Sequence, residues 1–430
     1  MTRSSCRSIV TRRLATRPSR ARPRRFLGCV WVLLALALPL RVAAQDPSGP
    51  TSGATRARLS FGGEAAVSIA PEDDAYFNYS TEAYSALRLV RLDGSAALKL
   101  GGWFSLIGDV RLLGGIGEGD WQIQPHALFA RLRPSPRVPI DIQAGLIPPV
   151  FGAFSRRTYG TENPLIGLPL GYQYVTTLRA DAVPISADDL LSKRGHGWLV
   201  QYPVGDPRPD HGVPLVNGLR YPAGIEVRVG GSQVEASVAV TTGTPSIPNA
   251  RDVGWHPQVS ARVGLRPVTG LVLGASASHG TFLSRSLTDM LGTTGAGGAN
   301  DQSAFGFDVE YSRGYWIVRA EGIYSRWRLA ASAPPYVASP LAGFAFDVEG
   351  RYRILPGLYA AVRLDRLDFS EICGSAECLP WDAPVRRVEA GGGYSLRRNM
   401  IVKGVYQYNW RDGSYQPTLG LASLQLLVWF

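Results

Sequence analysis

The sequence predicts an all-β fold, a transmembrane antiparallel β-barrel of about sixteen strands, with about eighteen as an alternative. Apolar and polar residues alternate over segments of about 10–13 residues, which is the length that a tilted strand needs to cross a bilayer. The connections between these segments alternate between tight turns and long irregular pieces. After residue 44, no apolar run reaches the roughly 18 residues that would indicate a spanning helix.

The N-terminal region has the pattern of an export signal. Residues 1–25 carry nine arginines and no acidic residue, and the apolar run 26–40 follows. Small residues at Ala43 and Ala44 complete the order that is typical of a secretory signal peptide. We expect cleavage after Ala44, which leaves residues 45–56 as a short N-terminal periplasmic segment. The alternative, an uncleaved anchor, needs a longer apolar run.

Loss of the signal peptide, residues 1–44, changes the charge balance of the chain. The whole sequence has 45 lysines plus arginines against 34 acidic residues, but ten of the arginines lie in the leader, so the remainder carries 35 against 34. A nearly neutral mature chain gives no reason to expect nucleic acid as a partner. The arginine pairs of the leader lack the following pattern of a twin-arginine signal, so we expect export by the Sec route.

Two cysteines remain after the leader, Cys373 and Cys378, in the stretch ICGSAEC. They lie in a segment without a strand pattern and would meet an oxidising compartment. We therefore expect a loop disulfide that contributes about 2 kcal/mol to stability. No histidine flanks the pair, so we expect no metal site there, and no motif in the mature chain indicates a cofactor.

Sixteen segments in chain order have the alternation and the length of barrel strands. The first five run from the leader to the longest connection, and the other eleven run from that connection to the C-terminus. Assigning the tight turns to the periplasm and the long loops to the exterior gives successive strands opposite directions. The segments are 57–69, 88–100, 103–113, 121–133, 138–146, 223–229, 232–243, 258–265, 271–283, 304–312, 315–327, 343–354, 358–369, 385–397, 400–411 and 420–430. Together they make a barrel over residues 57–430; pairing 171–179 with 196–205 would give eighteen strands.

Each segment has one apolar and one charged face. Phe305 and Phe307, for example, alternate with Asp308 and Glu310. A charge that faces lipid at mid-membrane costs about 2–4 kcal/mol, so the charged faces must line the lumen. The luminal wall predicted in this way comprises Asp109, Arg111, Asp308, Glu310, Arg319, Glu321, Glu349, Arg351, Arg363, Asp365, Arg387, Glu389, Lys403, Asn409 and Arg411.

The signs of the luminal charges nearly cancel. On one interpretation, neighbouring strands pair them into ladders that brace the wall. On the other, they set up a transverse field that orients polar solutes and rejects apolar ones.

Residues 147–222 form one external connection that contains ten prolines. A connection of this length is usually functional or disordered, and its aromatic and apolar content argues against disorder. We expect it to fold into the lumen and narrow the pore; the alternative is a lid over the outer rim or against a neighbouring subunit. The polar groups that would form the constriction are Arg156, Arg157, Tyr159, Glu162, Arg179 and Asp181.

The chain ends in LASLQLLVWF, with Leu424, Leu426, Val428 and Phe430 on one face. The terminal ring can lie in an aromatic girdle at the membrane edge. With this terminal strand and its overall architecture, the sequence resembles the Gram-negative outer-membrane porins, whose last strand typically ends in Phe and is recognised by the barrel-assembly machinery. DIQAGLIPPVFGAF is weakly similar to a segment of phosphate-selective porin O/P-type proteins. The resemblance implies an integral protein of the bacterial outer membrane, Phe430 as assembly signal, outer-membrane lipid and the assembly machinery as partners, and a possible homotrimer.

The function that we expect is a water-filled channel for passive diffusion of small polar or ionic solutes, and not an enzyme. The mature chain contains no hydrolase, metal-ligand or phosphate-loop motif. Ser278 and His279 are adjacent, so on a strand they point to opposite faces and cannot form a nucleophile and base with each other. The alternatives are a non-conducting barrel that serves as adhesin or anchor, and a barrel hydrolase.

Overall fold

The computed structural model describes residues 57–430 except 83, 117–120, 136–138, 249–256, 293–299, 330–332, 338 and 414. The expected signal peptide and the segment 45–56 lie outside the described residues. Both stay predictions.

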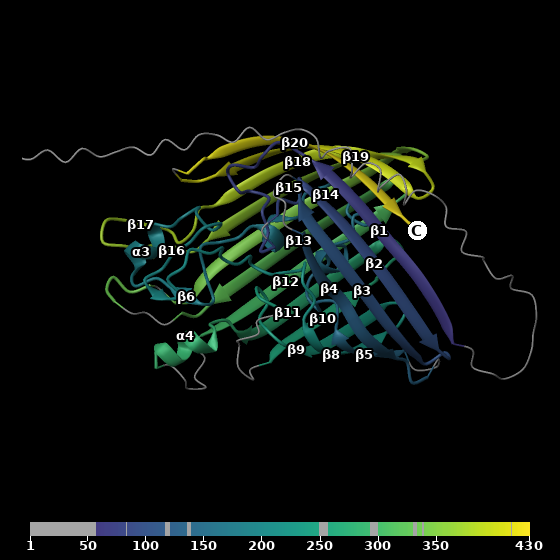
Figure 1. Cartoon of the computed structure of the whole chain (residues 1–430), viewed down its shortest axis with the longest axis horizontal. Coiled ribbons are helices and arrows are strands. Elements are labelled where there is room, and N and C mark those ends of the chain that lie inside the picture. The colour runs from purple at the N-terminus through teal and green to yellow at the C-terminus, as the bar shows by residue number, and fades with distance from the viewer. Residues whose placement is uncertain are drawn as a thin grey trace, which may run out of the picture. The chain divides into compact units, whose positions relative to one another are not determined.

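Sixteen antiparallel strands close into one barrel, in which β1 pairs with β20 (Figure 1). This confirms the predicted fold class and the count of sixteen. The strands are β1 (Arg58–Ile69), β2 (Leu89–Leu100), β3 (Phe104–Gly115), β4 (Trp121–Leu132), β5 (Ile140–Leu146), β8 (Ala223–Gly230), β9 (Val234–Thr241), β10 (Gln258–Leu265), β11 (Leu271–Thr281), β12 (Asp301–Arg313), β13 (Trp316–Trp327), β14 (Leu341–Leu355), β15 (Leu358–Phe369), β18 (Val385–Arg397), β19 (Met400–Arg411) and β20 (Thr418–Trp429).

The eighteen-strand alternative is wrong. Its two extra segments contain a helical turn, α2 (Leu170–Gln173), and one half of a separate two-stranded sheet, β6 (Ala182–Val183) with β7 (Val204–Gly205). β5 instead pairs directly with β8, with Leu146 opposite Ala223. The long connection therefore leaves and returns to the wall between neighbouring strands.

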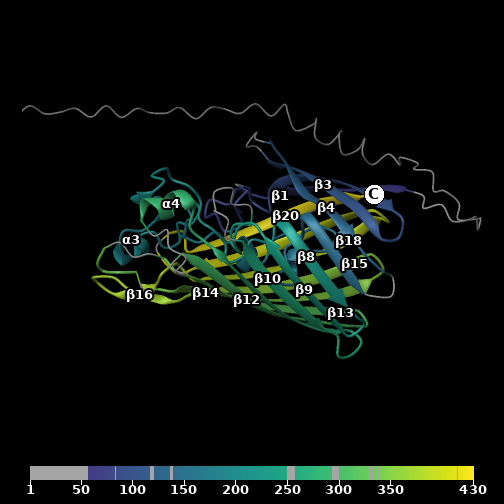
Figure 2. The same ribbon diagram turned by 90° about the horizontal axis from the view of Figure 1, so that it is seen from below.

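The two ends of the barrel differ. α3 (Ala187–Leu191), α4 (Arg285–Met290) and the ribbon of β16 (Glu371–Cys373) and β17 (Cys378–Pro380) lie at one end, and the chain terminates among tight turns at the other (Figures 1 and 2). The predicted disulfide Cys373–Cys378 is present and joins β16 to β17. The sequence had shown no strand pattern here, because three-residue strands are too short to display one. None of the described helices is long and apolar enough to cross a membrane.

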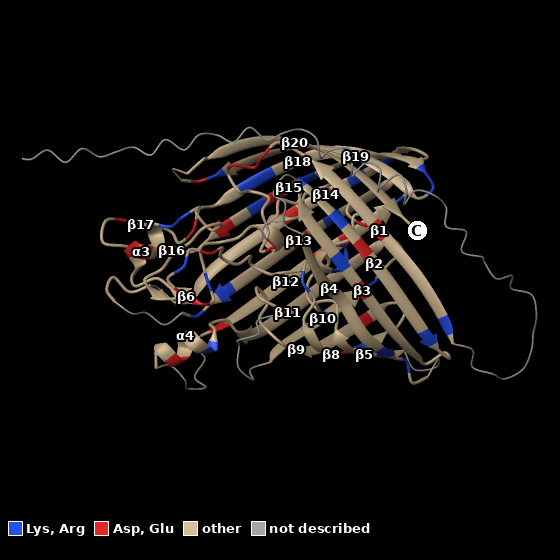
Figure 3. Ribbon diagram, in the orientation of Figure 1, with Lys and Arg blue, Asp and Glu red and all other residues tan. Residues whose placement is uncertain are grey.

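The side chains of the wall face as the alternation predicts. Phe307 is 59% exposed on the outside, whereas its neighbour Asp308 is 3% exposed on the inside. The charges of the wall appear as bands across the strands in Figure 3. The barrel therefore has an apolar outer surface and a charged inner one, as an integral membrane barrel requires.

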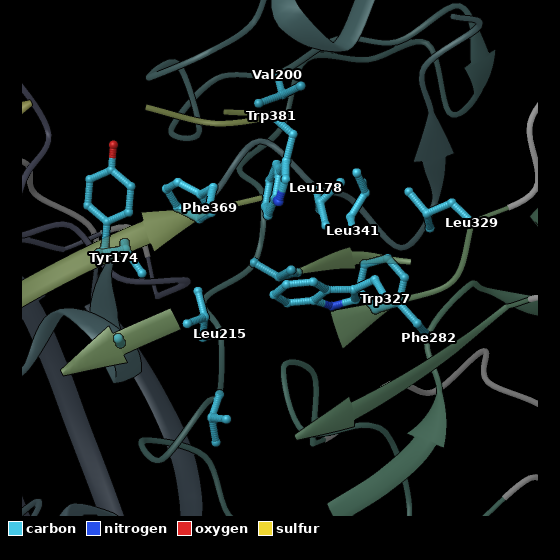
Figure 4. Packing of buried hydrophobic residues seen from close by; sticks show 14 of the residues in the cluster. Tyr174, Leu178, Val200, Leu215, Phe282, Trp327, Leu329, Leu341, Phe369 and Trp381 are labelled. Carbon is cyan, nitrogen blue, oxygen red and sulfur yellow. The ribbon is translucent and has the colours of Figure 1, made fainter. Parts of the chain in front are cut away.

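The end of the barrel that carries α3, α4 and the β16–β17 ribbon is called the loop end, and the other is called the turn end. At the loop end, an apolar cluster fills the interior (Figure 4). Trp327 and Trp381 are fully buried, with ring centroids 5.8 Å apart, and Phe282 lies against Trp327. Leu178 and Leu215 of the long connection belong to the same cluster. The connection is thus packed against strand ends and other loops rather than suspended in solvent.

Candidate pore constriction

The part of segment 147–222 that includes Ala153 and Tyr172 lies inside the barrel, because inward-facing wall residues bind it. Glu321 on β13 accepts hydrogen bonds from the N–H groups of Ala153 (2.9 Å) and Phe154 (3.1 Å), where the helical turn η1 (Phe154–Arg156) begins. It also accepts one from the Tyr172 hydroxyl at 2.5 Å. A lid over the outer rim therefore does not describe this part of the segment.

A second anchor holds the segment where it turns at Gly160. Lys403 on β19 donates from Nζ to the carbonyls of Gly160 (2.6 Å) and Asn163 (2.5 Å). Glu64 on β1 accepts from the N–H of Gly160 at 2.7 Å. Hydrogen bonds to charged groups contribute about 1.5–3 kcal/mol each, so one cation and one anion together fix this turn against two wall strands.

A third anchor follows along the same segment. Glu389 on β18 accepts from the N–H of Gly167 at 2.8 Å, and Arg387 on the same strand donates to the carbonyl of Leu168 at 3.0 Å. Arg363 on β15 supports Glu389 with a 2.6 Å ion pair. The wall charges thus form one network with each other and with the segment.

The loop end carries a further anchor outside the wall strands. Asp382 accepts from the N–H groups of Thr177 and Gly195, each at 2.8 Å, while Arg411 donates to the Gly195 carbonyl at 2.7 Å. Burial raises the pKa of Asp382. The N–H groups that donate hydrogen bonds to its carboxylate, and the positive charge of Arg411, lower the pKa. This carboxylate therefore fixes two distant parts of the segment to one point.

The wall charges make two kinds of contact, with each other and with the inserted segment. Cross-strand ladders do occur, since Arg319 pairs with Glu310 (2.6 Å) and with Glu349 (3.1 Å). Most of the predicted wall charges, however, are buried, and several of them, such as Glu321, Glu389 and Lys403, bind the inserted segment. The buried ones are Asp109, Arg111, Asp308, Glu321, Glu349, Arg363, Asp365, Arg387, Glu389, Lys403 and Arg411, whereas Glu310, Arg319 and Arg351 are partly exposed.

Arg156 and Arg157 lie inside the barrel and keep some access to water, with side chains 28% and 15% exposed. Arg156 is 3.6 Å from Glu235 on β9, and Arg157 is 3.3 Å from Glu349 on β14. The two adjacent arginines therefore point toward different stretches of wall. They remain the candidates for the narrowest charged point.

Tyr159 and Glu162 belong to the same inserted stretch. The Tyr159 hydroxyl donates to Asp109 at 2.6 Å, so this side chain anchors the segment to β3. Glu162 is exposed at the surface of the segment. Of the two, only Glu162 is free to face a solute path.

Arg179 and Asp181 are placed apart from the other candidates, near the small β6–β7 sheet. Arg179 is 2% exposed and donates to the carbonyls of Val200 (2.8 Å) and Arg208 (2.6 Å) and to Asp181 (2.9 Å). These contacts give Arg179 a structural role at the loop end. Four of the six candidate residues thus lie along the inserted stretch 156–162, and three of these contact different wall strands, whereas Arg179 and Asp181 lie outside this stretch.

Several buried charges of the wall were missed by the sequence reasoning. Glu64 pairs with Arg91, and Arg262 pairs with Asp308 at 2.5 Å. Glu226 is fully buried and pairs with the neighbouring Arg228. Their positions in the alternation of β1, β2, β8 and β10 are the same signal that identified the others.

Among the described residues, His279 makes the histidine–serine contact that bears on the hydrolase alternative. As predicted, it does not meet Ser278, which points inward; its Nδ1 lies 3.0 Å from Ser303 Oγ, and Nε2 is 3.6 Å from Asp301. Arg328 already holds both carboxylate oxygens of Asp301, at 2.8 and 3.0 Å. At 3.6 Å the Asp301 carboxylate is beyond hydrogen-bond distance of His279 Nε2. Within the described residues there is no cluster of His, Cys, Asp or Glu that could hold a metal ion.

Comparison with known proteins shows which solved structures have a similar fold. No family profile matches the chain, and no curated protein is similar to it in sequence. Among solved structures, the barrel is similar to Salmonella typhi OmpF in complex with daunomycin (TM-score 0.55, 13% identity, 86% of this chain and 97% of that one). It is also similar to an anion-selective porin from Comamonas acidovorans (TM-score 0.51, 11% identity, 87% and 100%) and to OmpT, an outer membrane protein of Vibrio cholerae (TM-score 0.50, 10% identity, 87% and 98%). At these identities the similarity establishes the fold alone.

Proposed function

We propose that this chain, an integral outer-membrane protein with the fold of the outer-membrane porins, conducts small polar or ionic solutes by passive diffusion. Segment 147–222 limits the flow. Short turns face the periplasm, and the loop end faces outward. The lipid-facing surface and the barrel-assembly signal at Phe430 serve its insertion, and a homotrimer is the assembly that we expect.

The observation that carries this proposal is the water contact of charged side chains inside the turn-end half of the barrel. Glu310, Arg156 and Glu235 have side chains that are 39%, 28% and 26% exposed. Barrels of 16–18 strands are wide enough to leave an aqueous channel unless the interior is filled. A polar vestibule that narrows at Arg156 and Arg157 is the arrangement that a small charged solute needs.

A non-conducting barrel, serving as adhesin or anchor, is the second candidate. The apolar cluster around Trp327 and Trp381 favours it, because this cluster fills the loop end of the interior. In that case the segment is a permanent plug.

Single-channel recording of the purified barrel in a planar bilayer separates the two candidates. A diffusion channel gives stepwise, ohmic currents, and a salt gradient gives a reversal potential near zero because the wall charges nearly balance. Silence over many insertions of correctly folded barrel, verified by heat-modifiable gel migration, would favour the plug. An esterase and protease assay on the same preparation tests the hydrolase alternative.

A further inference from the structure

A small pocket opens at the loop end, where three segments that are distant in sequence meet. Its volume is about 230 Å³, and its lining includes Tyr76, Trp198, Arg411 and Tyr415. Tyr76 lies in the β1–β2 loop, Trp198 in the long connection and Tyr415 in the β19–β20 loop. A pocket of this size is below the usual range for large ligands and fits one ring with its substituent.

Aromatic rings form much of this pocket. The rings of Tyr76 and Trp198 are stacked, with centroids 5.5 Å apart and an interplanar angle of 13°. The rings of His196 and Tyr415, which also line the pocket, have centroids 4.7 Å apart. Flat rings that converge on a small space favour a planar, cyclic ligand, because stacked and edge contacts both stabilise it.

Tyr76 adopts its position at a conformational cost. Its φ of 56° is left-handed, which is uncommon for a residue with a side chain. Such strain is concentrated at ligand clamps and active sites. Here the strained residue is the one that stacks on Trp198.

Arg411 supplies the polar end of the pocket. Its guanidinium is buried, and it donates to the carbonyls of Gly195 (2.7 Å) and Ala75 (2.5 Å), while its Nε has no partner. Arginine has five N–H donors, and the described residues accept hydrogen bonds from two of those of Arg411. Among the described residues no carboxylate forms an ion pair with it; Phe77 instead covers its face at 4.3 Å.

We propose that this pocket binds a small cyclic carboxylate, whose ring lies against Trp198 and Tyr415 and whose carboxylate pairs with Arg411. A carboxylate has the two-oxygen geometry that a guanidinium prefers. It also places a negative charge beside a buried guanidinium whose described hydrogen-bond acceptors are two carbonyls. The site requires the folded loops but not conduction, so a non-conducting barrel would bind in the same way.

Equilibrium dialysis of the refolded, detergent-solubilised barrel tests the proposal, with benzoate as the probe. We expect saturable, one-site binding of benzoate, and binding about tenfold weaker for benzamide, which keeps the ring and loses the charge. Acetate, which keeps the charge and loses the ring, should also bind about tenfold more weakly.

Two variants and a control locate the site. Trp198→Ala should weaken benzoate binding about tenfold, and Arg411→Lys should weaken benzoate binding while leaving benzamide binding unchanged. Tyr336→Ala removes an exposed aromatic residue from the same end of the barrel and should leave benzoate binding unaltered. The proposal is overturned if benzoate does not bind, or if benzoate and benzamide bind equally. It is also overturned if a folded Trp198→Ala variant keeps full binding, or if methyl glucoside, an uncharged ring, binds more strongly than benzoate.

Discussion

The ring of Phe430, the last residue, lies over Gly63 of the first strand on the lipid-facing side of the barrel. A Cβ placed on Gly63 would lie 2.7 Å from two carbons of that ring. The two backbones are also paired, with Phe430 N donating to the Gly63 carbonyl (3.1 Å) and Gly63 N to the Phe430 carbonyl (3.2 Å). The terminal residue thus completes the pairing of β20 with β1, the seam at which the barrel closes. Its ring covers Gly63, which has no side chain of its own to pack at this position.

Changing Phe430 to Asp should lower the amount of folded barrel in the outer membrane several-fold, because the change removes the ring from the seam and places a charge at the membrane edge. Heat-modifiable gel migration of membrane extracts measures this. Phe430→Tyr is the matched control and should fold normally. Gly63→Leu should reproduce part of the defect with Phe430 still present, since the added side chain displaces the ring; wild-type folding of both Phe430→Asp and Gly63→Leu contradicts the role of this contact.

Replacing residues 147–222 with a short Gly/Ser turn should raise single-channel conductance several-fold, because it empties the lumen. The wall tolerates the replacement, since Leu146 and Ala223 are paired neighbours that a tight turn can join. The anchoring charges would then be solvated by luminal water. Unchanged conductance in a folded variant would place the segment outside the solute path, and Arg156 and Arg157 would lose their role.

Changing both Arg156 and Arg157 to Glu should move ion selectivity toward cations, because the pair is the most concentrated positive charge on the inserted stretch. The reversal potential in a salt gradient measures the shift. Arg397→Glu with Arg398→Glu makes the same change of charge in an exposed turn of the wall and should have a much smaller effect. A shift of equal size in the two double variants would mean that selectivity is set at the rim.

Lys403→Met should destabilise the barrel by about 3–5 kcal/mol, because it leaves the carbonyls of Gly160 and Asn163, and the nearby carboxylates, without their cation. The turn at Gly160 should detach from β19 and become sensitive to protease, which mass spectrometry of limited digests can locate. Lys99→Met is the control, because Lys99 is exposed at the turn end of β2. Identical digests of the two variants would show that Lys403 does not hold the segment.

The sequence by itself determined the wall of this protein. Charges such as Asp308 and Arg319 cannot face lipid, and side chains on a strand alternate, so a single pattern fixed both the strand and its inner face. The same logic gave sixteen strands and the exposed position of Phe430. Strand ends differ by only a few residues from the prediction, for example Asp301 rather than 304 at the start of β12.

The tertiary structure alone decided what the inner face does. Alternation assigns Lys403 and Glu389 to the lumen, but it carries no information about what lies across it. Their partners are backbone groups of a segment more than 200 residues away in sequence, which has no periodic pattern. Arg179 looked equivalent to Arg156 for the same reason: both are arginines in one irregular connection, and only the folded path separates a buried structural cation from one that contacts water. Periodicity records which solvent each face of a strand meets, whereas contacts between an irregular segment and a wall depend on the path of the chain in three dimensions.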